Sequence, residues 1–320
     1  MRRIISTRAI PLLTFGFACI AFATVPIVRS QGIVSHELAV YAEARSVVDL
    51  TVEELLRTYP GELGDLEFAE NQAELGFMLQ KTGESVEAFF RDFPNTASKE
   101  QVRLERLRAD GRIDDHIEQN FNYLLVVHPD KEGINYEESR TDSGGHPIRP
   151  ARLRGYSSLS SGFAGTSVFF HPRYQSSSRF RYLGRQRSEP NYFAIAFAQR
   201  PETGICFGTF RVGERMLPIP LLYQGLAWVD PLTYQIVRLR TDLLAPRSDV
   251  GLTRQTSEIW LSEVRFTTVT KTFWLPREVL VTVSSLGQIF RNRHRYSDYQ
   301  VFLVESHDKI EPPKVKKKPQ

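Results

Sequence analysis

The chain has 320 residues, of which 41% are hydrophobic and 24% charged. This composition argues against a disordered chain, and the length suits one large domain or a domain with a smaller helical part. The two cysteines, Cys19 and Cys206, are too few for a disulfide framework or a cysteine-based metal site. The net charge of +4 hides a segregation, because residues 31–120 hold nine basic and 19 acidic side chains while both ends of the chain are basic.

Residues 1–30 have the order of features typical of a secretory signal peptide. Three arginines precede an apolar run from Ala9 to Val28, and small residues follow at cleavage-type positions. The run is long enough, at about 20 residues, to span a bilayer uncut, so a retained anchor is the alternative. We expect cleavage, export to the periplasm or the extracellular space, and no stable transmembrane span in the mature chain.

The next segment, residues 31–112, is expected to form an acidic helical subdomain. Thr51 with Glu54, and Ser98 with Gln101, match the capping box that begins a helix. Each pair stands ahead of aliphatic residues at helical spacing. The segment is therefore predicted to hold helices near both of its ends.

Prolines and glycines, Gly83 among them, are expected to divide this segment into four or five short helices. The helices share an apolar stripe, which must be buried among them or against a sheet. A groove for a partner helix is the alternative. The stripe consists of Leu66, Leu75, Met78, Leu79, Val86, Phe89, Phe90 and Phe93.

Residues 113–306 are rich in β-branched and aromatic residues and have turn-like breaks, which is typical of strands. No helical segment separates the strands, so a parallel α/β sheet is excluded. The fold class expected is α+β, with one large curved antiparallel sheet of about ten or eleven strands. The expected strands are Phe121–His128, Tyr136–Thr141, Ser167–Phe170, Arg179–Arg187, Tyr192–Gln199, Ile205–Val212 and three long runs between Leu221 and Ser306.

Two of the long runs alternate clearly, because successive side chains of a strand point to opposite faces. In the run 235–243, Val237, Leu239 and Leu243 are expected on one face and the charged residues on the other. In the run 273–283 the same argument groups Phe273, Leu275, Val279, Val281 and Val283. The sheet therefore has an apolar face that needs a partner.

Two segments are predicted to lie outside the sheet. Residues 149–165 show neither helical nor strand period and are expected to be a loop, either a plain surface excursion or a binding flap. The tail, residues 307–320, is rich in lysine and proline and is expected to be disordered.

Arginines recur at period two, so each row projects from one face of the sheet. Three interpretations stay open: a solvated convex face, docking against the acidic helical block, or contact with an anionic lipid or polymer. Single-stranded nucleic acid is disfavoured by export. The rows are Arg179/Arg181, Arg185/Arg187, Arg238/Arg240 and Arg291/Arg293/Arg295.

No motif for catalysis stands out. The chain lacks a nucleophile elbow, a glycine-rich phosphate loop and the histidine spacing of a metal site. After removal of the leader Cys206 is alone, and a lone cysteine in an apolar run is typical of a packed side chain. We therefore expect no enzyme, no cofactor and no metal, with a secreted hydrolase as a distant alternative.

The stretch Gly225-Leu226-Ala227-Trp228-Val229-Asp230, followed by Thr233 and a later strand with Phe273-Trp274-Leu275-Pro276, resembles the later strands of LolA-like periplasmic proteins. That superfamily includes lipoprotein carriers, lipid-binding LppX-type proteins and the sigma-regulator RseB. The resemblance covers roughly residues 115–306. It implies a sheet that curls into an unclosed half-barrel over helices, whereas the long acidic helical block departs from these carriers.

This resemblance implies a non-catalytic cell-envelope protein whose hollow holds a lipid, an acyl chain or a lipoprotein. Burial of an acyl chain would contribute about 0.8 kcal/mol per methylene. The alternative is an envelope protein-interaction module whose hollow is filled by its own side chains. The expected lining residues are Trp228, Trp260, Trp274, Phe266 and Tyr296, with packing in the strand core as the other interpretation.

Overall fold

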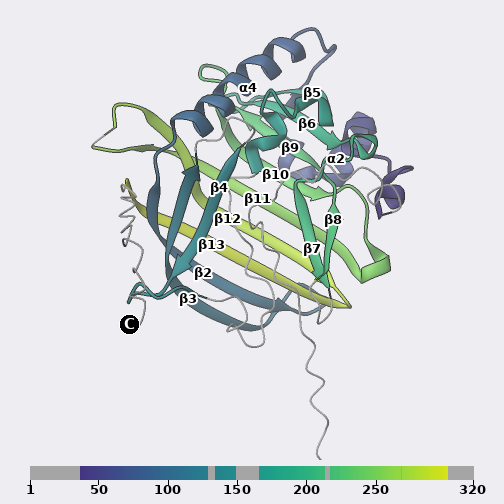
Figure 1. Ribbon diagram of the computed structural model, residues 1–320. Helices are drawn as coiled ribbons and strands as arrows, with labels where there is room; N and C mark the ends of the chain where they lie inside the picture. Colours follow the sequence, from purple (N-terminus) through teal and green to yellow (C-terminus); the bar gives the residue numbers. More distant parts are fainter. Residues whose placement is uncertain (1–36, 129–133, 149–165, 213–216, 268, 302–320) are drawn as a thin grey trace, which may run out of the picture.

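A computed structural model describes residues 37–128, 134–148, 166–212, 217–267 and 269–301. Its main feature is an 11-stranded sheet in the order β1-β5-β6-β9-β10-β11-β12-β13-β2-β3-β4, in which all neighbouring strands are antiparallel (Figure 1). The edge strands β1 and β4 do not pair, so the curved sheet stays open. The expected α+β fold with an unclosed half-barrel is confirmed.

The strands of the large sheet range from three to 16 residues. A separate ribbon is formed by β7 (Gly208–Val212) and β8 (Leu217–Leu221). The large sheet consists of β1 (Leu66–Phe68), β2 (Thr96–Leu107), β3 (Ile113–His128), β4 (Asn135–Thr141), β5 (Ser178–Gln186), β6 (Phe193–Gln199), β9 (Tyr223–Val229), β10 (Ile236–Leu243), β11 (Leu252–Arg265), β12 (Thr272–Ser285) and β13 (Gln288–Val301).

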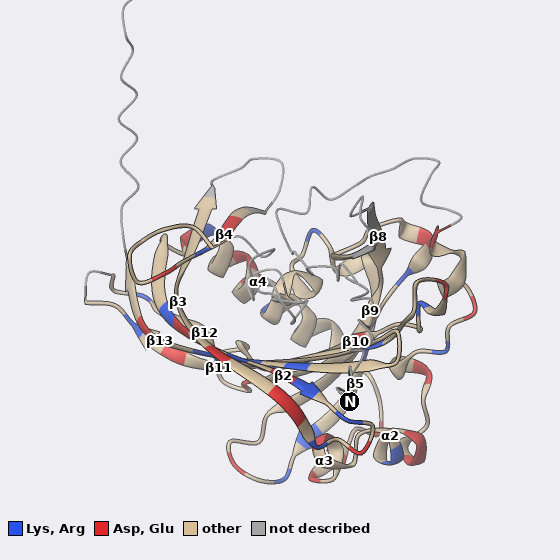
Figure 2. Cartoon of the chain, turned by 90° about the horizontal axis from the view of Figure 1, so that it is seen from below, with Lys and Arg blue, Asp and Glu red and all other residues tan. Residues whose placement is uncertain are grey.

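Helices lie on both sides of the sheet. Figure 2 shows α4 within the concave side and the short helices α2 and α3 against the convex side. The helices are α2 (Val52–Thr58), α3 (Pro60–Leu63) and α4 (Leu75–Asp92), with 3₁₀ turns η1 (Ala39–Tyr41), η2 (Val47–Asp49), η4 (Thr166–Phe170), η5 (Gln175–Ser177), η6 (Pro201–Thr203) and η7 (Ser248–Val250).

Each side of the sheet has its own apolar core. The concave core, defined by buried residues of α4, η4 and the inner faces of β3, β6 and β9–β13, contains Phe90, Phe170 and Leu275. The convex core contains Leu55 and Leu63 of the short helices together with Trp228 of β9. Because both faces of β6 and β9 are covered, β6 is buried along its whole length.

Of the two predicted helix starts, the one at Thr51 is confirmed. At the start of α2, the Thr51 side chain accepts from the Glu54 amide and the Glu54 carboxylate accepts from the Thr51 amide, which confirms that capping box. The prediction that Gly83 ends a helix is wrong, because it lies inside the 18-residue α4. A Cβ at Gly83 would lie 2.6 Å from Nε2 of Gln175, so the glycine permits close packing rather than a break.

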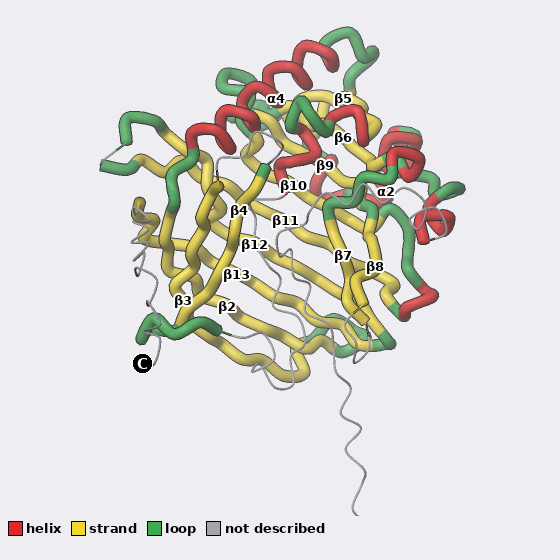
Figure 3. Tube along the Cα trace, in the orientation of Figure 1, coloured by secondary structure: helices red, strands yellow, loops and turns green. Residues whose placement is uncertain are grey.

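The predicted helix at Ser98 is also wrong, since residues 96–107 form β2, between β13 and β3 (Figure 3). Glu100, Val102 and Leu104 are buried at every second position, which is a strand period. The Ser98–Gln101 spacing is a local signal, and pairing on both edges of the strand overrides it. Leu66, assigned to the helical stripe, likewise lies in a strand, β1.

Two further strand assignments change. Residues 167–170, predicted as a strand, lie in the 3₁₀ turn η4, where three successive apolar residues are all buried against α4 and β6. The strand predicted from Ile205 begins at Gly208 and pairs with β8 instead of joining the large sheet. The predicted leader, the loop 149–165 and the tail 307–320 lie outside the described residues.

The predicted apolar face of β12 is confirmed: Phe273, Leu275, Val279, Val281 and Val283 all belong to the concave core. In β10, Leu239 and Leu243 also face the concave core, but Val237 belongs to the convex one. A register shift between Ile236 and Arg238 explains the difference, because a bulge reverses the alternation on one side of it.

One of the three interpretations accounts for part of the arginine rows. Arg179 donates to Asp49 at 2.7 Å, and Arg240 donates to Glu62 of α3, so these rows hold the N-terminal segment against the sheet. Arg291 instead pairs with Glu105 of β2, a partner within the sheet. Docking against the acidic segment therefore accounts for the rows next to α2 and α3.

Candidate ligand-binding site

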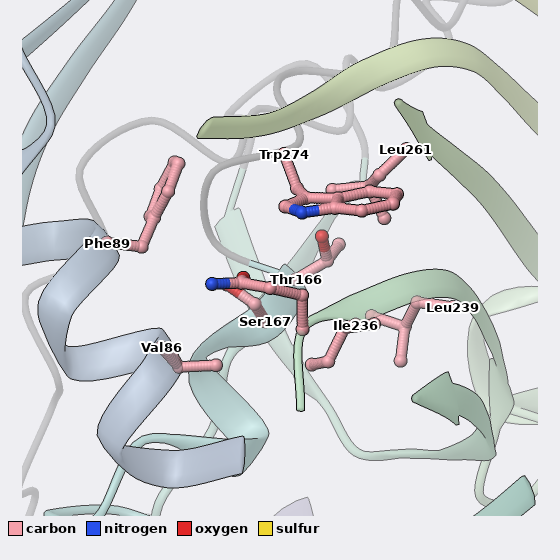
Figure 4. Close-up of a pocket in the computed structure, with 9 residues that line it drawn as sticks. Val86, Phe89, Thr166, Ser167, Ile236, Leu239, Leu261 and Trp274 are labelled. Atoms are coloured by element: carbon pink, nitrogen blue, oxygen red, sulfur yellow. The ribbon is translucent and has the colours of Figure 1, made fainter. Parts of the chain in front are cut away.

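A small apolar cavity of about 40 Å³ lies between α4 and the concave face of β10–β12. In Figure 4, α4 contributes side chains from one side and β11 and β12 from the other. The cavity is lined by Val86, Phe89, Thr166, Ser167, Gln235, Ile236, Leu239, Leu261 and Trp274.

The local structure explains how these side chains converge. Val86 and Phe89 are three residues apart on α4 and so lie on one face of the helix. Ile236 and Leu239 are also three apart, a spacing that a regular strand would send to opposite faces. The bulge after Ile236 corrects the parity, and both residues line the cavity.

A few directional contacts hold α4 over this cavity. The Gln175 amide donates to the carbonyl oxygen of Leu79 in α4 and to that of Phe170 in η4, each at 2.8 Å. At the end of the helix, Lys271 of the β11–β12 connection donates to Asp92 at 2.5 Å. The rest of the attachment is apolar packing along the buried stripe of α4.

The size of the cavity limits what it holds as it stands. A water molecule needs roughly 10–15 Å³ of cavity, so about 40 Å³ admits about three waters and is far below the several hundred cubic ångströms typical of ligand pockets. Aromatic side chains fill the neighbouring space: Phe89 stacks on Phe93, and Phe169 and Phe170 pack against Phe197 of β6. A long apolar ligand requires α4 to move away from the sheet.

Further along the concave side, a buried ion pair joins β2 to β4. The side chains of Glu100 and Arg140 are 0% and 8% exposed, and the guanidinium donates to both carboxylate oxygens. Oε1 of Glu100 also lies 2.8 Å from Nδ1 of His294 and accepts from the Tyr296 hydroxyl at 2.9 Å. These contacts use the carboxylate fully.

The charge state of this pair follows from its surroundings. Burial by itself raises the pKa of Glu100, but the Arg140 charge and the hydrogen bonds from His294 and Arg140 outweigh it and lower that pKa to about 2. The pKa of Arg140 is raised, because Glu100 outweighs its burial. Both groups are charged at neutral pH, as expected of a structural ion pair.

No protein-family model and no curated protein matches the sequence. Among solved structures, the chain is similar to a domain assigned to outer membrane lipoprotein sorting from Vibrio parahaemolyticus and to a DUF1329 family protein from Desulfovibrio piger. Each has a TM-score of 0.36 and 9% identity, and the match covers 72% of this chain and 94% of the other. The MucA/MucB complex of Pseudomonas aeruginosa matches with a TM-score of 0.21 and 11% identity, over 72% of this chain and 100% of the other.

Likenesses this distant carry no argument about what the chain binds. The architecture is established by the sheet itself: an open, strongly curved antiparallel wall with α4 against its concave side. This is the architecture that the resemblance to LolA-like proteins implies.

The structure separates the five residues predicted to line the hollow. Trp274 lines the cavity and also packs against the convex core. Trp228, 1% exposed, belongs to the convex core, and the Arg238 guanidinium lies between its ring and that of Trp260, at 4.3 and 5.4 Å from the centroids. Phe266 and Tyr296 are both buried in the concave core, Phe266 beside Phe273 and Tyr296 with its hydroxyl donating to Glu100.

The sequence identified several of the lining residues as apolar, but it did not indicate that they line the same cavity. Val86 and Phe89 stand in the predicted helical stripe, and Leu239 stands on the predicted apolar strand face. No local signal assigns these three side chains to one cavity, because the contacts span about 150 residues of sequence. The only available signal was that each belonged to an apolar face in need of a partner.

The metal-binding and thiol chemistry of the described part of the chain is limited. No group of three or more His, Cys, Asp or Glu residues there could hold a metal ion. Burial raises the pKa of the Cys206 thiol to about 11, so the thiol is protonated at neutral pH and weakly nucleophilic. No helix in the same ranges is long and apolar enough to cross a bilayer.

Proposed function

We propose that this protein is an exported, non-enzymatic binding protein of the cell envelope that holds an apolar chain, such as a lipid or lipoprotein acyl chain, between α4 and the half-barrel. The observation that supports this proposal is the apolar cavity beneath α4. It lies where a helix with one apolar face covers a strongly apolar sheet. In this proposal the ligand replaces the contacts of Val86 and Phe89 when α4 moves outward.

A second candidate is an envelope protein-interaction module without a ligand cavity. It is favoured by the small volume of the cavity and by the phenylalanines that fill the adjacent hollow. The two candidates differ in a measurable way. Protein purified from its native envelope carries a lipid in native mass spectrometry under the first candidate and a clean apo mass under the second.

Quenching of tryptophan fluorescence gives a site-specific test. A myristic acid carrying a bromine or nitroxide quencher, used below its critical micelle concentration, is expected to quench Trp274, which lines the cavity. Trp274→Phe should therefore abolish most of the quenching. Trp260→Phe is the matched control, because Trp260 packs against Arg238 and does not line the cavity. Equal quenching of both variants would argue against ligand entry at this site.

Filling the cavity should weaken binding of the same fatty acid. Leu261→Trp places a larger side chain into the cavity from β11. We expect its dissociation constant to rise at least about 10-fold, equivalent to about 1.4 kcal/mol. Isothermal titration and the quenching assay measure this change. Unchanged affinity, in a variant with an unchanged melting temperature, would place the acyl chain elsewhere.

Export is proposed from the leader alone, since residues 1–36 lie outside the described structure. The charge, apolar run and small residues of residues 1–30 predict a mature N-terminus near Thr24 or Gln31. N-terminal sequencing of the protein from an envelope fraction measures this directly. A chain that begins with Met1 in the membrane fraction would contradict cleavage and indicate an anchor.

A further inference from the structure

Two exposed apolar side chains and a half-buried tyrosine stand in the first turns of α4 and at the β9–β10 turn. Leu232 is 87% exposed, the highest value among the large hydrophobic side chains that the described ranges contain, and Phe77 of α4 is 54% exposed. The Phe77 ring meets the ring of Tyr234 edge-on at 5.7 Å. We call Phe77, Leu232 and Tyr234 the mouth patch.

The turn between β9 and β10 presents Leu232 in a fixed position. Oδ1 of Asp230 accepts from the amides of Leu232 and Thr233, at 2.9 and 2.8 Å, and from the Thr233 hydroxyl at 3.0 Å. Tyr234 closes the turn in the left-handed region, with φ of 55°, and its amide donates to the Asp230 carbonyl. The outward position of Leu232 is thus fixed by the side-chain hydrogen bonds of Asp230.

The mouth patch adjoins the cavity at the β9–β10 turn. Gln235 and Ile236, which line the cavity, follow Tyr234 directly, and the Tyr234 ring meets Phe77 of α4. A ligand entering between the turn and α4 would pass these apolar side chains first. The partner whose chemistry matches this apolar entrance is therefore the lipid bilayer that contains the acyl chain.

The charges beside the patch favour a neutral surface. Lys81 lies over the Phe77 ring, 6.0 Å from its centroid, and pairs with Glu84 at 2.8 Å. The Asp230 carboxylate is used within the turn. Lys81 stands against two carboxylates, so the patch has no basic excess, and the zwitterionic headgroup region of a bilayer suits it better than an anionic one.

We propose that the mouth patch docks on a bilayer surface, with Leu232 and Phe77 entering the acyl region, so that an apolar chain passes from the membrane to the cavity. The identity of the passing chain rests on the proposed function, whereas docking itself does not. The occupant proposed is a bilayer; an apolar protein surface is the outcome indicated if vesicles are not bound.

Flotation with vesicles of phosphatidylcholine and phosphatidylethanolamine tests the docking. The wild-type protein is expected to float with the vesicles, and Leu232→Asp and Phe77→Asp to reduce the bound fraction at least about 10-fold. Leu286→Asp is the control: Leu286 is 60% exposed at the β12–β13 turn, outside the patch, and its φ of 49° suits aspartate. Vesicle binding that survives both patch variants, or that Leu286→Asp also abolishes, would overturn the proposal.

Soluble quencher-labelled myristate separates this proposal from the proposed function. Leu232→Asp should still bind it, because Leu232 does not line the cavity. Myristate binding without vesicle binding in the wild type would overturn docking and leave the cavity function intact. Vesicle binding that depends on Leu232, without quenching of Trp274, would support docking and count against the acyl-chain site. Circular dichroism of every variant checks that the sheet is intact.

Discussion

Gly225→Ala is expected to lower the free energy of unfolding by more than about 3 kcal/mol. Gly225 lies in β9, between β6 and β10, and a Cβ there would stand 1.9 Å from the carbonyl oxygen of Arg240. It would also lie 3.0 Å from the Phe197 ring. The carbonyl belongs to the paired backbone of β10, so the clash is relieved only by separating strands at the centre of the sheet.

Urea denaturation followed by circular dichroism measures this effect, with Gly61→Ala as the matched control. A Cβ at Gly61 meets nothing within 4 Å, and the residue lies in helix α3. The control should leave stability unchanged or raise it by up to about 1 kcal/mol, because alanine favours the helix. A loss of less than about 1 kcal/mol for Gly225→Ala would mean that β9 and β10 lie further apart than described.

Arg140→Met is expected to lower the free energy of unfolding at pH 7 by about 3 to 5 kcal/mol. The variant leaves the Glu100 carboxylate, 0% exposed, without its guanidinium partner. Arg295→Met is the control, because Arg295 is 56% exposed and lies 3.5 Å from Glu278; its loss should cost no more than about 1 kcal/mol. Equal effects of the two variants would contradict a structural role for the buried pair.

The stability of Arg140→Met should depend on pH in a direction that the buried ion pair determines. In the folded protein the pKa of Glu100 is about 2, below the value of about 4.3 in an unfolded chain. Its contribution to stability is therefore present above about pH 5 and is lost as the pH falls toward 2. Without Arg140, burial of the Glu100 carboxyl is no longer opposed by the guanidinium charge, so the variant gains stability when this carboxyl is protonated. The difference in the free energy of unfolding between the wild type and Arg140→Met should therefore become smaller between pH 7 and pH 4. A difference that widens on acidification would show that Glu100 is not the group responsible.

The pattern of neighbouring residues was sufficient to predict the structure where the interactions that decide it are also between neighbouring residues. The alternation in β12 identified five concave side chains correctly, because a strand with one dry face must alternate. The Thr51–Glu54 capping box likewise needs only four consecutive residues, and it forms as expected. The curved antiparallel sheet followed from many such strands without helices between them, whereas its unclosed form was implied by the resemblance to LolA-like proteins.

Local pattern failed where distant partners decided the outcome. The Ser98–Gln101 spacing favours a helix start, but β13 and β3 pair with both edges of that segment and make it a strand. Gly83 was expected to break a helix because glycine disfavours helices, yet it lies within the continuous helix α4. Gln175, 92 positions later in the chain, packs against it there. Val237 changed face because a bulge in its pairing with β9 reversed the alternation.

By itself, the sequence determined that this chain has the features of an exported protein and that its body is an antiparallel sheet with an apolar face, since composition, leader and strand period are properties of neighbouring residues. Only the tertiary structure decided that α4 covers the concave side and that α2 and α3 cover the convex side, where Arg240 pairs with Glu62. It also decided that Trp274 lines the cavity whereas Trp228 is buried in the convex core. The physical reason is that a cavity forms where two packed surfaces, here the apolar face of α4 and the concave face of the sheet, do not fit together completely. Its position depends on how a helix stripe and a twisted sheet pack together, and neither surface carries that information alone.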